Sequence, residues 1–93
     1  MNYLFLIRSN LEEMETFSAA VVCAENEEKA KYIHPDKKSQ WRDNAWWTNK
    51  DMWTDEKITY SWCKPEEVKI EKIGISASNI TAGTVILTSY NEP

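Results

Sequence analysis

The chain has few of the residues from which catalytic and phosphate-binding sites are usually built. Gly74 and Gly83 are the only glycines among its 93 residues, so no glycine-rich loop can cradle a phosphate group. His34 is the only histidine, and neither the converging ligand set of a zinc site nor the base of a nucleophilic triad is evident. We therefore predict no metal, no cofactor and no enzymatic activity.

Cysteine is also scarce, and no apolar run is long. Cys23 and Cys63 lack the spacing of a metal-binding pair, so we expect two reduced thiols, with Cys23 buried in a strand. The longest apolar runs, Leu4 to Ile7 and Ala19 to Ala24, are too short to span a bilayer. No basic region precedes the first run, so a signal peptide is not expected. These absences favour a cytoplasmic protein that does not enter a membrane.

The overall composition is that of one soluble globular domain covering residues 1–93. Apolar residues make up 42% and charged residues 28% of the chain, which is ordinary for a globular protein. The formal net charge is -4, and a chain of this sign repels the phosphate backbone. Binding to nucleic acid is therefore disfavoured.

Both ends of the chain show the alternation of β-strands. Strands are predicted at 2–8 and 17–24, joined by a short polar link that favours an antiparallel pair. Asn26 is a good helix N-cap, and Pro35 should end the helix at His34, for which we expect a structural or capping role. Two further strands are predicted at 68–77 and 84–90, with a β-bulge at Glu71 and Lys72 that would place four aliphatic residues on one face.

The predicted order is β-β-α-insert-β-β, in which residues 36–62 form a long Trp-rich insert. We expect an α+β domain with an antiparallel sheet of about four strands and one short helix. The order of the strands is left open by the sequence.

The insert contains all five tryptophans of the chain, interspersed with charged residues. Their spacing fits neither one helical stripe nor one alternating strand, and the adjacent Trp46 and Trp47 would point to opposite faces of a strand. Some rings can cover the sheet, and Trp62 is the best candidate because it directly precedes the third strand. The remaining rings, with one arginine, form the predicted binding surface: Trp41, Arg42, Trp46, Trp47 and Trp53.

Three functions are compatible with such a surface. The first is a non-enzymatic module that binds another protein, because aromatic anchors with a polar rim dominate protein interfaces. The second is a binder of a small planar ligand such as a nucleotide, stacked on Trp and held by Lys37, Lys38 or Arg42. The third is a structural role in which the surface is buried against a second copy, giving a homo-oligomer.

The two ends of the chain resemble a family of small proteins found in phages and prophage-bearing bacteria, whose function is uncharacterised. The similar stretches are Ala20 to Ala30 continuing to Ile33-His34-Pro35, of which Glu25 to Pro35 is the helical part, Trp62 to Val68, Ile73-Gly74, and Gly83 to Asn91. The resemblance implies a setting in which a phage protein binds and inhibits or modulates a host protein, including host defence systems. It implies no catalytic residue.

Overall fold

The computed structural model describes residues 1–9, 16–49, 55–58 and 62–91. The elements in chain order are β1 (Tyr3–Arg8), β2 (Thr16–Ala24), α1 (Glu27–Ala30), β3 (Gln40–Arg42), β4 (Ala45–Asn49), β5 (Asp55–Ile58), the 3-10 helix η1 (Pro65–Glu67), β6 (Lys69–Ile75) and β7 (Val85–Asn91). The strands form two antiparallel sheets, and the predicted α+β character with one short α-helix is confirmed. The larger sheet has four strands, and the smaller sheet has three strands that the sequence did not predict.

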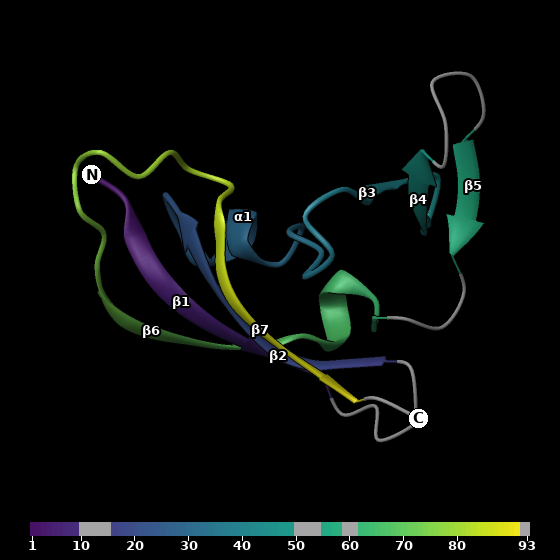
Figure 1. Ribbon diagram of the computed structural model, residues 1–93, viewed down its shortest axis with the longest axis horizontal. Coiled ribbons are helices and arrows are strands. Elements are labelled where there is room, and N and C mark those ends of the chain that lie inside the picture. Colours follow the sequence, from purple (N-terminus) through teal and green to yellow (C-terminus); the bar gives the residue numbers. More distant parts are fainter. Residues whose placement is uncertain (10–15, 50–54, 59–61, 92–93) are drawn as a thin grey trace.

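The larger sheet has the order β6-β1-β2-β7, and each neighbouring pair is antiparallel. Strand β1 therefore lies inside the sheet, as its apolar residues on both faces predict. Its pairing with β2 places Phe5 opposite Val22 and Ile7 opposite Ala20, and these side chains are buried. Figure 1 shows that the sheet is strongly curved and that α1 lies on its concave side. The concave face is therefore the core face.

The bulge in β6 lies slightly beyond its predicted position. Lys72 pairs with Phe5 and Gly74 pairs with Leu4, so Ile73 is the extra residue. Ile73 and Ile75 are 47% and 63% exposed, so neither is buried in the core. Ile75 keeps its place in the ladder opposite Tyr3, whereas Ile73, as the unpaired residue of the bulge, leaves the alternation that the prediction of one shared face required.

The helix begins as predicted but ends earlier. The Asn26 side chain accepts a hydrogen bond from the Lys29 amide at 2.9 Å, which is an N-cap contact. The helix ends at Ala30 and not at His34, because the next amides, those of Tyr32 and Ile33, bond three residues back in a tightened turn. Ala30 is fully buried, so this single turn is held by its packing against the larger sheet.

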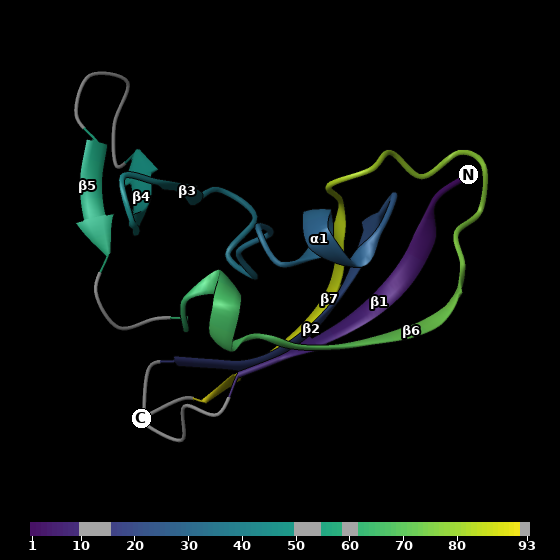
Figure 2. The same cartoon turned by 180° about the vertical axis from the view of Figure 1, so that it is seen from behind.

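The Trp-rich segment contains a second sheet, which the sequence did not predict. Strands β3, β4 and β5 form an antiparallel meander in that order. The β3–β4 hairpin turns at Asp43 and Asn44, whose φ values of 49° and 58° are those of a type I′ turn. Asp and Asn are the non-glycine residues that best tolerate this conformation, so they were the available signal for the hairpin. In Figure 2 the small sheet stands apart from the larger one, across η1 and the segment after α1.

One apolar cluster includes residues of both sheets and of the segment before η1. Phe5 and Val22 from the larger sheet, Trp46 from the smaller sheet, and Trp62 and Cys63 all belong to it. The expectation that Trp62 packs into the core is confirmed, since it is 4% exposed. Within the described residues, no helix is long and apolar enough to cross a membrane.

Candidate functional site

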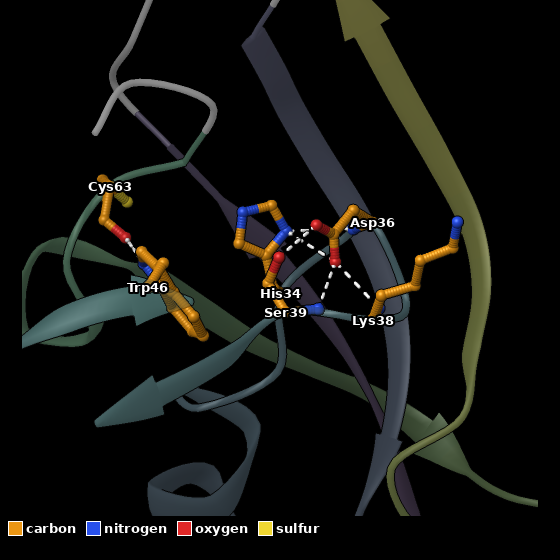
Figure 3. Close-up of polar contacts among 6 residues, drawn as sticks. All are labelled: His34, Asp36, Lys38, Ser39, Trp46 and Cys63. Carbon is orange, nitrogen blue, oxygen red and sulfur yellow. Dashed lines mark hydrogen bonds and ion pairs between the residues drawn. The ribbon is translucent and has the colours of Figure 1, made fainter. Parts of the chain in front are cut away.

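Trp46 belongs to the core and is not available as a surface anchor. Its ring is 3% exposed and lies edge-on to His34, with 5.0 Å between ring centroids. Its indole N–H donates to the carbonyl oxygen of Cys63 at 2.9 Å, as Figure 3 shows. This bond ties the middle of β4 to the segment that leads into η1. The structure therefore places this predicted binding residue in the core.

His34 and Asp36 are joined by a hydrogen bond next to the aromatic side chains of the core. The His34 side chain is fully buried, and its Nδ1 accepts a hydrogen bond from the Asp36 amide at 3.0 Å. Its ring contacts Phe17 and Trp46 edge to face. These contacts give His34 a structural role.

The Asp36 carboxylate organises the turn that precedes β3. It accepts hydrogen bonds from the amides of Lys38 and Ser39, both at 2.8 Å, and from the Ser39 hydroxyl (Figure 3). Burial alone would raise the pKa of Asp36, but these bonds and the neighbouring His34 hold that pKa well below its usual range. His34 Nδ1 also lies 3.2 Å from Asp36 Oδ1.

Arg42 and Trp47 lie together on the outer face of the smaller sheet. The Arg42 guanidinium lies 4.9 Å from the Trp47 ring centroid, and the Trp47 indole donates to the Arg42 carbonyl oxygen at 3.0 Å. Arg42 also forms an ion pair with Asp55 of β5. The adjacent Trp46 and Trp47 point to opposite faces, as strand geometry predicts.

Trp41 lies on the inner face, opposite Trp46, with 5.3 Å between the ring centroids. It is only partly buried, and it lines two hollows that also share Asn44 and Lys64. We call these two hollows together the Trp41 groove. Its first hollow adds Tyr32 and Glu66, and its second adds Lys57 and Trp62. Polar and charged side chains thus lie beside a partly buried aromatic ring.

Trp62 contributes an unusual feature to the second hollow. Its indole Nε1 is buried, and no hydrogen-bond acceptor for it is present in the described part of the chain. Sequence reasoning missed Asn44, Lys57 and Lys64 as neighbours of Trp41, because only the hairpin and η1 bring them together. The signal for Asn44 was the Asp-Asn turn, and nothing in the local sequence indicates the two lysines.

The remaining predicted residues lie elsewhere. Lys37 and Lys38 are exposed on the turn after His34 and line neither hollow of the Trp41 groove. Figure 3 shows the Lys38 side chain extending away from Trp46. Trp53 lies outside the described residues. Arg42 therefore contacts Trp47, whereas Trp41 lines a hollow with two lysines that were not predicted, Lys57 and Lys64.

Both cysteines are buried free thiols. Cys23 donates from Sγ to the Ser76 hydroxyl at 3.3 Å. Burial raises the pKa of the Cys63 thiol, which disfavours the reactive thiolate. Across the described ranges, no three His, Cys, Asp or Glu side chains are grouped as a metal site requires.

The chain was compared with protein-family models, with curated proteins and with solved structures, and none of the three comparisons found a match. The chain's own geometry is therefore the basis for proposing a function.

Proposed function

We propose that this chain is a non-enzymatic binding protein whose contact surface is the β3–β4 hairpin, and that its partner is another protein. The observation that carries the proposal is the position of Trp41. Its neighbours Trp46 and Trp62 are buried in the core, whereas Trp41 is only partly buried and lines two hollows together with charged side chains. An aromatic side chain surrounded by a polar rim is the usual composition of an interface hot spot.

Arg42 and Trp47 extend this surface around the hairpin. Arg42 is held over Trp47 and by Asp55, so its guanidinium is positioned before a partner arrives. Ordering a side chain in advance reduces the entropy lost on binding. Arginine and tryptophan are also the residues most enriched at hot spots, which supports a protein partner.

We propose a host protein as that partner, which extends to this surface the expectation that the ends of the chain resemble small phage proteins. We propose that the chain acts in the host cytoplasm by covering a functional surface of the host protein, and so inhibits or modulates it. A defence protein is the class of host target that this setting favours. Free buried thiols agree with a reducing compartment.

The test is affinity capture from a host lysate, followed by titration of the purified captured protein. Trp41→Ala should weaken the binding of that protein by a factor of about 30 or more, the loss typical of a hot-spot residue. Ile73→Ala, which shortens an exposed aliphatic side chain on an edge strand, is the matched control and should bind as the native chain does. Equal binding by Trp41→Ala and native protein would reject the proposed surface.

A second candidate function is self-association through the outer face of the larger sheet. Leu6 of β1, Val21 of β2 and Leu87 of β7 are paired side by side there, and they line a shallow apolar hollow. Leu87 is 65% exposed, which leaves apolar surface in contact with water. Sedimentation of native protein and of Leu87→Ser tests this role, because only the native chain should form dimers at high concentration. A native chain that stays monomeric throughout would exclude it.

A further inference from the structure

We propose that the second hollow of the Trp41 groove binds a carboxylate from an acidic segment of the partner protein. This inference rests on the proposed function and specifies what the partner presents to the hairpin. The hollow has a volume of about 210 Å³ and lies between the β3–β4 hairpin and the residues before η1. Its walls combine aromatic rings with hydrogen-bond donors and cations.

The buried indole of Trp62 supplies the first argument. An indole N–H is a donor only, so nothing but an acceptor atom can satisfy it. The described residues provide no acceptor for it, although Trp46, the other buried tryptophan of this core, has one in the Cys63 carbonyl oxygen. Buried polar groups are almost always paired, and those that are not require an explanation. Because Nε1 is covered from solvent, an oxygen atom of a group bound in the hollow completes this donor through a small shift of the Trp62 ring.

The charges around the hollow supply the second argument. Lys57 and Lys64 line it and are exposed, and no acidic residue is among its described lining residues. This is a local concentration of positive charge on a chain whose formal net charge is -4. The Asn44 side chain, which carries amide donors, also lines the hollow. The neighbouring hollow is lined by both Lys64 and Glu66, whose charges offset each other, so an anion is favoured more in the second hollow than in the first.

The aromatic walls favour a carboxylate on a hydrocarbon stem over a free phosphate. Trp41, Trp46 and Trp62 present apolar surface against which the methylene groups of a glutamate can pack. Phosphate groups are usually held by several backbone amides of a glycine-rich turn, and neither Gly74 nor Gly83 lines this hollow. A protein segment that carries Asp or Glu fits these walls, and it is the kind of partner that the hairpin surface requires.

The experiment follows the indole N–H signal of Trp62 in ¹H–¹⁵N NMR spectra of the whole chain. A hexaglutamate peptide is titrated into the protein, with hexaglutamine as the neutral comparison and inorganic phosphate as the free-anion comparison. We expect a saturable downfield shift of the Trp62 indole proton with hexaglutamate only. Each of Lys57→Gln and Lys64→Gln should weaken this binding about threefold, as expected for an exposed ion pair. Lys69→Gln, which neutralises an exposed lysine on β6, is the matched control and should leave it unchanged.

The possible results separate this inference from the proposed function. The carboxylate site is overturned if hexaglutamate does not shift the Trp62 indole signal. It is also overturned if Lys57→Gln and Lys64→Gln bind hexaglutamate as tightly as the native chain does. A response to phosphate at the same concentrations overturns the choice of a protein segment. If Trp41→Ala no longer binds the captured partner but hexaglutamate does not shift the Trp62 signal, the proposed function is supported and the carboxylate site is rejected. If Trp62 responds but Trp41→Ala still binds the partner, the carboxylate site stands and the proposed function fails.

Discussion

At the scale of single residues, two buried tryptophans differ in one hydrogen bond. Trp46 and Trp62 are almost equally buried, but only the Trp46 indole has an acceptor among the described residues. Replacing either ring with phenylalanine removes a similar volume and leaves a similar cavity. The two substitutions therefore differ mainly in what happens to the N–H group.

We predict that Trp46→Phe destabilises the protein more than Trp62→Phe does. Trp46→Phe leaves the Cys63 carbonyl oxygen without its donor, whereas Trp62→Phe removes a donor that lacks a partner. The difference in free energy of unfolding should be about 1 to 2 kcal/mol. Urea unfolding of both variants measures it, and equal stabilities would show that the indole bond of Trp46 contributes nothing.

Asp36 gives a prediction about pH. Its folded pKa lies below the ordinary value of 3.8, so its charged form stabilises the fold above that pH, and this contribution is lost as the pH falls toward the folded pKa. Asp36→Asn should lower the free energy of unfolding by about 1 kcal/mol at pH 7, because hydrogen bonds to a charged acceptor are weakened. The gap between native and variant should shrink steadily below pH 3.8.

Thermal unfolding across this pH range checks the Asp36 prediction. Glu71→Gln removes an exposed carboxylate on β6 and controls for the loss of one negative charge. A native-to-variant gap that is independent of pH would contradict the role assigned to the Asp36 carboxylate.

At the scale of secondary-structure elements, the β3–β4 hairpin depends on its two-residue turn. Asp43 has a φ of 49°, a conformation that β-branched residues rarely adopt. Asp43→Val should destabilise the protein by about 1 to 2 kcal/mol relative to Asp43→Gly. Chemical denaturation of this pair of variants tests the turn, and equal stabilities would argue against a left-handed conformation at this position.

Elements near the ends of the chain could be predicted because simple signals determine them. The alternation of Phe5 and Ile7 defined β1, and Asn26 defined the start of α1. The end of α1 could not be predicted from Pro35. A proline shows where a helix cannot continue, but it does not show where the backbone hydrogen bonds change to partners three residues back. The exact residue of the β6 bulge was missed because several neighbouring positions restore the same alternation.

The second sheet and the groove could not be predicted for a different reason. Strand β5 reads Asp55-Glu56-Lys57-Ile58, which has little intrinsic strand preference, so its structure depends on pairing with β4. Residue type alone predicts a binding surface but does not distinguish the core position of Trp46 from the partly buried position of Trp41. Lys57 and Lys64 come together only through tertiary structure.

At the scale of the whole molecule, one core connects the two sheets. Phe5 and Val22 of the larger sheet belong to the same apolar cluster as Trp46 of the smaller sheet. A shared core makes unfolding cooperative, because neither sheet can lose it without exposing the other. Tryptophan fluorescence and far-ultraviolet circular dichroism should therefore give coincident urea unfolding curves. Two separate transitions would show that the sheets unfold independently.

The bulge at Ile73 has a consequence for the behaviour of the protein at high concentration. Strands β6 and β7 are the two edges of the larger sheet, and a register shift also leaves Ile86 of β7 as an extra residue. A regular, flat edge strand can pair with the edge of another molecule and start aggregation, whereas a bulge twists the edge and interrupts its row of donors and acceptors. The irregularities on both edges thus protect a sheet rich in exposed aliphatic side chains from growing into a fibril.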